Sequence, residues 1–290
     1  MAVYFSLQAA LCFSIAHIFI RRGLVESNAM PGSFISLSMS AGVLWLLTPF
    51  FVPFTAFWTP AIGIFIAAGI FAPGIGRTLS YVGIERIGVA RSVPIVNSSP
   101  IFASIFAVLF LGETWILQNI IGTLLVISGV VTLSMVKPAV GEWHKRDIIF
   151  PIIGALAFGA SSNLRKAGLS YVSMPLLAAA VTAGSAAIFS FILLQIRGGK
   201  AAFKFTRNSA PWLIAASFFN TAALLSVFYA LSRGKVVIVD PLVSSNPVMT
   251  LLLTAIFLRD LEALNLRVIV GALLTVAGTI LVVTVVVTVK

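Results

Sequence analysis

Two clusters of small polar residues stand directly before two prolines, and their side chains could bind a polar solute through neutral hydrogen bonds. The clusters are Asn97, Ser98 and Ser99 before Pro100, and Ser244, Ser245 and Asn246 before Pro247. In a helix each proline removes one backbone hydrogen bond and leaves the carbonyl of Val96 or Val243 without its usual donor. The side chains therefore either line a wet cavity or repair the kinks and join neighbouring helices. Their occurrence at two matching places favours the cavity.

Further polar candidates lie in other apolar stretches of the chain. Ser162 and Asn163 stand at the centre of one stretch, and His17 occupies the matching place in another. Imidazole titrates near neutral pH, so His17 could bind a solute or carry a proton, but a neutral histidine hydrogen-bonded between helices is the favoured interpretation. Asn220 falls where a matching stretch carries Pro73, and both are expected in the cavity wall.

Three more residues have alternative roles. Arg77 could hold a carboxylate through a bidentate pair, but snorkelling to the headgroups is the favoured interpretation. Asp240 precedes Pro241, a pairing typical of helix N-termini, so we expect it to cap a helix, with a proton relay as the alternative. Tyr81 could stack on a solute or belong to an interfacial aromatic belt.

The motifs of the common hydrolases and metalloenzymes are absent from the sequence. It contains no Gly-x-Ser-x-Gly, no His-Glu-x-x-His and no phosphate-binding glycine loop. Cys12 is the only cysteine, which excludes an intrachain disulfide and a thiolate metal cluster. We therefore expect no catalysis, no metal and no cofactor.

The elements that carry these residues are apolar enough to need lipid as their solvent. Of 290 residues, 60% are hydrophobic and 9% are charged, against roughly 25% charged in soluble domains. Ten stretches reach the roughly 17 to 25 residues that cross a bilayer as a helix: 3–20, 32–52, 60–82, 90–111, 116–136, 148–168, 173–196, 209–231, 238–258 and 264–288. The composition predicts an all-α, multi-pass protein of the cell membrane.

The basic residues are placed as in a membrane protein and not as in a nucleic-acid-binding domain. The chain has 19 Lys and Arg against 8 Asp and Glu, and nearly all of the basic residues fall in short gaps between apolar stretches. Thirteen of them follow the odd-numbered stretches, and five lie on the other side. By the positive-inside rule this bias places both termini outside the cytoplasm. We expect the lipid bilayer as a partner, and no nucleic acid.

The chain contains an internal repeat of five apolar stretches. Residues 88–100 match residues 235–247 at an offset of 147. We therefore divide the chain into repeats at 1–137 and 148–290, joined by a linker at 138–147. Because five is odd, the second repeat enters the membrane from the opposite side, which makes the two repeats inverted around a central cavity. One monomer suffices for the complete cavity.

Glycines recur in the fifth stretch of each repeat. Gly122 and Gly129 match Gly271 and Gly278, and each pair is seven residues apart. A seven-residue spacing puts both glycines of a pair on one helix face. We therefore expect the fifth and tenth helices to pack closely against each other.

These residues make the chain resemble the drug/metabolite transporter superfamily in its ten-helix EamA form. The resemblance covers essentially the whole chain and rests on Asn97-Ser-Ser-Pro100, Leu111-Gly-Glu113 and the glycines at 122 and 129. The second repeat departs from the usual Leu-Gly-Glu with Leu258-Arg-Asp260. The chain looks most like bacterial amino-acid and metabolite exporters of the inner membrane. The family usually keeps both termini in the cytoplasm, which disagrees with the charge count.

The function predicted from the sequence is export of a small neutral or zwitterionic metabolite, with amino acids first, by alternating access. The expected hinges or fixed bends are Pro94, Pro100, Pro241 and Pro247. The presumed cavity offers neutral hydrogen-bonding groups and few fixed charges, which suits such a solute. The alternatives are an exporter of lipophilic drugs or toxic cations and, less favoured, an intramembrane enzyme or a channel, for which no filter-like sequence is present.

Overall fold

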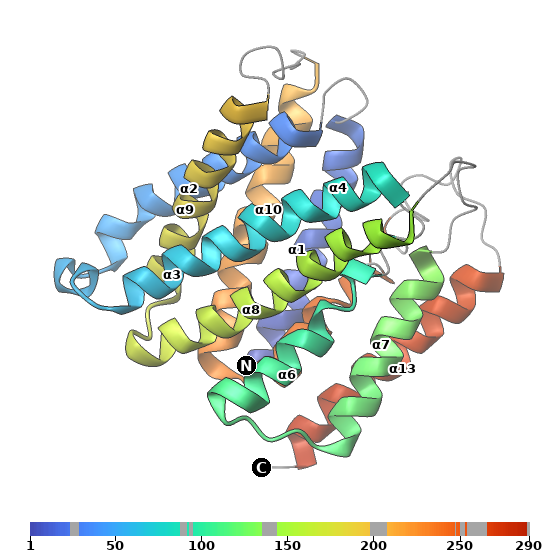
Figure 1. Cartoon of the computed structure of the whole chain (residues 1–290). Coiled ribbons are helices and arrows are strands. Elements are labelled where there is room, and N and C mark those ends of the chain that lie inside the picture. Colours follow the sequence, from blue (N-terminus) through green and yellow to red (C-terminus); the bar gives the residue numbers. More distant parts are fainter. Residues whose placement is uncertain are drawn as a thin grey trace.

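The computed structural model is built of helices, as the composition predicts (Figure 1). It describes residues 1–23, 29–87, 92, 95–134, 144–197, 208–246, 248–249, 253 and 266–288, and within these residues there is no strand. Each of the ten predicted stretches overlaps a described helix. The expectation of an all-α bundle is therefore confirmed.

The helices follow the order of the predicted stretches in both halves of the chain. The first half contains α1 (Ala2–Gly23), α2 (Ala29–Phe51), the short 3-10 helix η1 (Phe54–Phe57), α3 (Ala61–Gly69), the π-helical segment η2 (Ile70–Gly76), α4 (Arg77–Ile87), α6 (Ser99–Leu111) and α7 (Leu117–Ser134). The second half contains the 3-10 helix η3 (Lys145–Ile148), α8 (Ile149–Tyr171), α9 (Pro175–Arg197), α10 (Ala210–Arg233), α11 (Val236–Val243) and α13 (Leu266–Thr288). The start of α1 and the end of α13 lie at one end of the bundle (Figure 1), which we call the terminus side.

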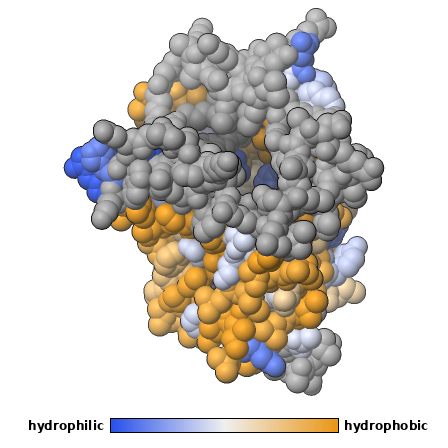
Figure 2. Space-filling model, turned by 90° about the vertical axis from the view of Figure 1, so that its right-hand side faces the viewer, coloured by the Kyte–Doolittle hydropathy of each residue, from blue (hydrophilic) through white to orange (hydrophobic). Residues whose placement is uncertain are grey.

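The long helices are apolar over lengths that cross a membrane. Among the described residues, six helical spans of 18 to 26 residues are long and apolar enough to do so, and shorter apolar helices accompany them. Large hydrophobic side chains point outward, among them Phe50, which is 76% exposed, and Leu46, which is 70% exposed. Figure 2 shows hydrophobic atoms over most of the described surface in its lower half. Lipid solvates such a surface, whereas water would drive it to aggregate.

The third predicted stretch passes Pro73 as a continuous helix. α3, η2 and α4 follow one another without a gap, and η2 is a π-helix that contains Pro73. Pro73 has no N–H to donate, and the wider π turn accommodates the missing bond within a continuous helix. The hydroxyls of Thr78 and Ser80 donate to the carbonyls of Gly74 and Gly76 at 2.9 and 2.7 Å. Side-chain hydroxyls thus supply donors inside the segment.

The fourth and ninth predicted stretches are interrupted helices and not continuous kinked ones. α6 begins only at Ser99, after a turn, and Pro100 lies in its first turn, where the absent N–H costs no helical bond. α11 ends at Val243 and contains Pro241. Pro94 and Pro247, the other two expected hinges, lie outside the described residues.

Polar residues repair both interruptions in the same way. Ser98 Oγ donates to the carbonyl three residues before it at 2.6 Å, and Ser245 Oγ, 147 positions later, does so at 2.7 Å. Nδ2 of Asn246 donates to the carbonyl of Val243 at 3.0 Å, which is one of the two carbonyls that we expected to lack a donor. Of the two roles that the sequence allowed, lining a cavity or repairing an interrupted helix, these three side chains perform the repair.

The packing partners of the helices follow the inverted repeat. α1 packs along α10, while α8, the repeat counterpart of α1, packs along α3, η2 and α4, the counterparts of α10. α2 packs on its own counterpart α9, and α7 packs on its counterpart α13 (Figure 1). Each contact therefore has a counterpart under exchange of the two halves. This is the pattern of a pseudo-twofold axis between inverted repeats.

The glycines of α7 and α13 bring these two helices into backbone contact, as their spacing predicts. A Cβ on Gly278 would lie 2.6 Å from the carbonyl oxygen of Gly122, and a Cβ on Gly129 would lie 2.6 Å from the carbonyl oxygen of Gly271. Real Cβ atoms essentially never approach backbone atoms this closely. The predicted close packing of the fifth and tenth helices is confirmed.

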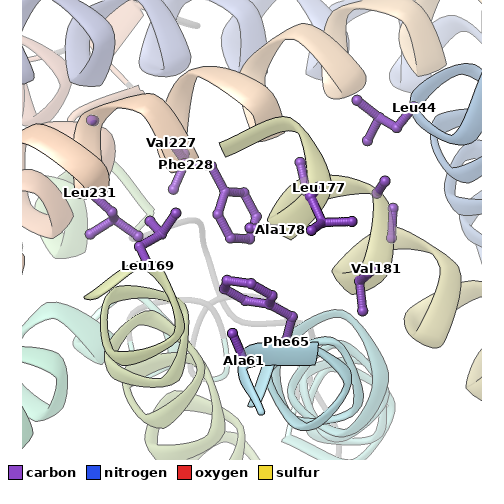
Figure 3. Close-up of a cluster of buried hydrophobic side chains, with 14 of the residues drawn as sticks. Leu44, Ala61, Phe65, Leu169, Leu177, Ala178, Val181, Val227, Phe228 and Leu231 are labelled. Carbon is purple, nitrogen blue, oxygen red and sulfur yellow. The ribbon is translucent and has the colours of Figure 1, made fainter. Parts of the chain in front are cut away.

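A hydrophobic cluster fills the terminus-side part of the bundle. Its centre is the pair Phe65 and Phe228, both fully buried, whose rings meet edge to face with centroids 6.2 Å apart. Figure 3 shows these rings between Leu169, Leu177 and the neighbouring helices. The cluster joins α1, α2, η1, α3, α6, α8, α9, α10 and α11.

We expect Gly278→Ala to lower the melting temperature of the detergent-solubilised protein. The added methyl group overlaps the backbone of α7, and overpacking of this kind costs about 1–3 kcal/mol. The matched control is Gly42→Ala on α2, where an added Cβ meets nothing within 4 Å and alanine favours the helix. Equal melting temperatures for Gly278→Ala and the unsubstituted protein would contradict the close contact of α7 and α13.

Candidate functional site

A central cavity of about 300 Å³ lies on the side of the hydrophobic cluster that is away from the termini. Its wall draws on α1, α2, η2, α4, α6, α8, α9, α10 and α11. It therefore lies between the two repeats, as expected for inverted halves. α2 and α9 belong to this wall in addition to the helices that carry the predicted residues.

Seven of the residues that the sequence singled out line this cavity. They are His17, Ser99, Ser162, Asn220, Asp240, Ser244 and Asn246. They come from α1, α6, α8, α10, α11 and the turn that follows α11. Residues far apart in the chain thus meet around one space, and Pro73 of η2 also lies in its wall.

Four other predicted residues lie outside the cavity wall. Ser98 and Ser245 bond to the helix interruptions, and Asn97 lies half-buried in the turn before α6. Asn163 is buried, and its Nδ2 donates to the carbonyls of Ala103 and Gly159, both at 2.9 Å. Asn163 therefore ties α8 to α6.

Three further candidates fall partly or wholly outside the described residues. The backbone of Tyr81 belongs to α4, but its side chain lies outside the described part of the structure. Pro94 and Pro247 are outside it altogether.

Asp240 does not cap a helix, contrary to our expectation. It lies inside α11, whose N-cap is Lys235, and the first amides of α11 are bound by the Glu113 carboxylate instead. The Asp240 carboxylate faces the cavity and accepts a hydrogen bond from Ser162. The Asp240-Pro241 sequence predicted a helix N-terminus wrongly, because Pro241 lies in the last turn of a short helix and not in the first.

Arg77 lines the cavity, which favours the carboxylate-binding interpretation over snorkelling to the headgroups. It is the first residue of α4, directly after the π-helical segment. Its guanidinium lies near enough to His17 for the two groups to interact electrostatically. A π segment shifts the direction of the residues that follow it and is frequent at functional sites.

Arg165 was missed by the sequence analysis and is part of the cavity wall. Its guanidinium lies 5.5 Å from the ring centroid of Phe228 and interacts with the charge of Asp240. Its buried Nε has no hydrogen-bond partner among the described residues. Arg165 falls within the predicted span 148–168, three residues after Ser162, a spacing that puts both side chains on one helix face.

α2 supplies two serines that sequence reasoning also missed. Ser36 and Ser40 line the cavity, and their hydroxyls accept hydrogen bonds from Asn220 Nδ2 at 3.1 Å and Thr221 Oγ1 at 2.8 Å. The four-residue spacing of these serines places them on one face of α2. That spacing within an apolar stretch is the signal that could have identified them.

The cavity is more charged than the sequence suggested. Two guanidinium groups, Arg77 and Arg165, and one carboxylate, Asp240, share its wall with amides and hydroxyls. Burying charges at membrane depth is costly, so such groups pair with one another or with a solute. The described residues contain no cluster of three His, Cys, Asp or Glu that could hold a metal ion. The arrangement can bind a small solute that carries both a negative and a positive group.

Comparisons with known proteins match this chain to a family and to a fold. A family model described as "EamA-like transporter family" matches residues 1–135 and 145–284. Comparison with curated proteins finds no match. A solved structure described only as "Crystal structure of protein" is similar with a TM-score of 0.79 and 13% identity, over 98% of this chain and 96% of that chain. At this identity the similarity shows the fold alone.

We expect Asn163→Ala to lower the melting temperature, because the hydrogen bond from Asn163 Nδ2 to the carbonyl of Ala103 is lost. An intramolecular hydrogen bond contributes about 0.5–1.5 kcal/mol to stability. Thermal unfolding in detergent measures the change, with Asn97→Ala as the matched control in a half-buried turn. If both variants melt at the temperature of the unsubstituted protein, the contact of α8 with α6 through Asn163 contributes nothing.

Proposed function

Because the chain belongs to the EamA-like transporter family, we propose that it exports a small zwitterionic or neutral metabolite, an amino acid first of all. The transport mode we propose is alternating access through the central cavity. A volume of about 300 Å³ is at the small end of the range for ligand pockets. It suits one small metabolite.

The observation that carries the proposal is the presence of opposite charges in the cavity wall. Arg165 and Arg77 are suited to hold the carboxylate of an amino acid, since a guanidinium pairs with a carboxylate through two parallel hydrogen bonds. Asp240 is suited to hold the ammonium group. Asn220 and Ser244 supply neutral hydrogen bonds nearby.

The same wall argues against the exporter of lipophilic drugs or toxic cations that the sequence left open. Two guanidinium groups and a single carboxylate line the cavity. A cation entering such a space is repelled by more charges than attract it. A zwitterion can place its negative group beside an arginine and its positive group beside Asp240, so it loses less free energy when it enters the cavity.

The inverted repeats support alternating access, because two similar halves can exchange two similar packings. The interruptions before α6 and at the end of α11 are the points where a short helical piece can turn on its neighbours. We propose Pro100 and Pro241 as hinges there, together with Pro94 and Pro247. His17 and Asp240 are the proposed sites of proton coupling.

We propose the bacterial inner membrane as the location of this protein. The basic residues gathered after the odd-numbered stretches support an orientation with the end of the bundle away from the termini in the cytoplasm, opposite to the family's usual one. The central cavity lies on that side of the hydrophobic cluster. In this orientation it receives its solute from the cytoplasm, as an exporter requires.

We expect Arg165→Gln to raise the KM for the transported amino acid by about tenfold or more, because a charge-assisted hydrogen bond is lost. The measurement is counterflow in proteoliposomes with a panel of labelled amino acids, sugars and lipophilic cations, with and without a pH gradient. The panel identifies the solute, and the gradient tests coupling.

The matched control for this measurement is Arg86→Gln. Arg86 is exposed and pairs with Asp147 at 3.0 Å, outside the cavity wall. The KM of the Arg86→Gln variant should therefore match that of the unsubstituted protein. An unchanged KM for Arg165→Gln would remove Arg165 from the binding site. Counterflow of lipophilic cations without counterflow of amino acids would overturn the substrate proposal.

A further inference from the structure

A second cavity lies at the terminus side of the bundle. It measures about 520 Å³, and its wall comes from the end of α2, the connection between α8 and α9, and the last turns of α10. Ser232, Tyr229 and Arg233 give it hydroxyl groups and a positive charge. The Arg233 guanidinium lies over the rings of Phe5 and Tyr229, at 5.3 and 5.2 Å from their centroids.

The hydrophobic cluster separates this second cavity from the central one. On α10, Leu224 and Val227 line the central cavity, Leu225 and Tyr229 line the second cavity, and Phe228 is fully buried in the cluster. Figure 3 shows the ring of Phe228 facing that of Phe65, with Val227 on the same helix. The two cavities therefore lie on different faces of α10, and Phe228 belongs to the cluster that separates them.

We infer that Phe65 and Phe228 form the closed gate between the binding cavity and an exit cavity on the terminus side. The inference rests on the proposed transport function. The exit cavity offers the departing solute a cation, Arg233, and the hydroxyls of Tyr229 and Ser232, which bind a carboxylate as the binding cavity does. Between the two cavities the apolar rings exclude a polar solute as long as they touch.

Polar contacts at the terminus side hold the gate closed. Glu113, on the connection after α6, is 8% exposed, and its two carboxylate oxygens accept hydrogen bonds from the amides of Val236 and Val237 at 2.8 and 3.1 Å. Lys166 on α8 donates to two carbonyls at the end of α10, both at 2.7 Å. These bonds fix the start of α11 and the end of α10, and the latter carries Phe228. The Glu113 bonds join the first repeat to the second, which a rocking motion must separate, and the Lys166 bonds join α8 to α10 within the second repeat.

Arg165 connects the binding cavity to the gate. Its guanidinium lines the central cavity and lies over the ring of Phe228 at 5.5 Å. A carboxylate bound at Arg165 competes with the ring for the guanidinium, because an ion pair is stronger than a cation–π contact at such a site. Solute binding therefore loosens one contact that keeps Phe228 in place.

The gate is tested by the accessibility of a cysteine in the central cavity. In a Cys12→Ser background, Ser99→Cys supplies the reporter, and a membrane-impermeant methanethiosulfonate is applied from the terminus side of vesicles of known orientation. We expect little labelling of this protein from that side. Adding Phe228→Ala should raise the labelling rate at least about tenfold. The substitution removes the ring that closes the path, and the free energy lost with a buried phenylalanine exceeds the free energy that corresponds to a tenfold change.

The matched control is Phe218→Ala, which removes a phenylalanine on the same helix that is 67% exposed, and it should leave the labelling rate unchanged. An unchanged rate in folded Phe228→Ala overturns the gate. Labelling needs no transported solute. If the cation panel succeeds and the amino-acid panel fails while Phe228→Ala opens the path, the gate stands and the substrate proposal falls.

A milder substitution decides the matter if Phe228→Ala does not fold. Glu113→Gln keeps one acceptor oxygen and removes the charge, and it should also raise terminus-side labelling. Its control is Asp147→Asn, an acid that pairs with Arg86 at the other end of the bundle. Equal labelling rates for Glu113→Gln, Asp147→Asn and the reporter protein overturn the role of the Glu113 contacts.

Discussion

The lipid bilayer offers no water for hydrogen bonds, so every backbone group and every charge inside it must find its partner within the protein. Continuous helices meet this demand along most of the described chain. Where a helix is interrupted, a side chain supplies the missing bond: Ser98 before α6 and Ser245 after α11. At helix ends, Glu113 and Lys166 bind the open amides and carbonyls. Other polar groups, among them Ser162, Asn220 and Asp240, line a cavity between the repeats.

The scaffold follows the inverted repeat more closely than the site does. Helices pack in matching pairs across the two halves, but the charges of the cavity have no such counterparts. Ser162 matches His17, and Arg165 and Asp240 occur in the second repeat alone. The symmetric helix scaffold supplies two similar packings of the repeats. The asymmetric wall of the central cavity distinguishes the two ends of a solute. The glycine contact of α7 and α13 belongs to the frame, and the Asp240 and Arg165 pair belongs to the wall.

Sequence alone could predict the helices, the repeat, and the glycine packing, because hydrophobicity and spacing act locally. It also indicated eight residues of the cavity wall, Pro73 among them. It could not separate Ser162 from Asn163, which are adjacent in the chain yet face a cavity and a neighbouring helix, respectively. The orientation of Arg77 depends on the π segment before it, and the role of Asp240 depends on a carboxylate 127 residues away that binds the amides of α11. Both are effects of tertiary structure.

The central claim is that the opposite charges of the cavity recognise the two ends of a zwitterion. The most direct test is an experimental structure of the protein with the amino acid that it transports. The account expects the solute carboxylate within hydrogen-bond distance of the Arg165 guanidinium and the solute ammonium group beside Asp240. A solute bound outside this cavity, or bound in it with its carboxylate away from both arginines, would contradict the account.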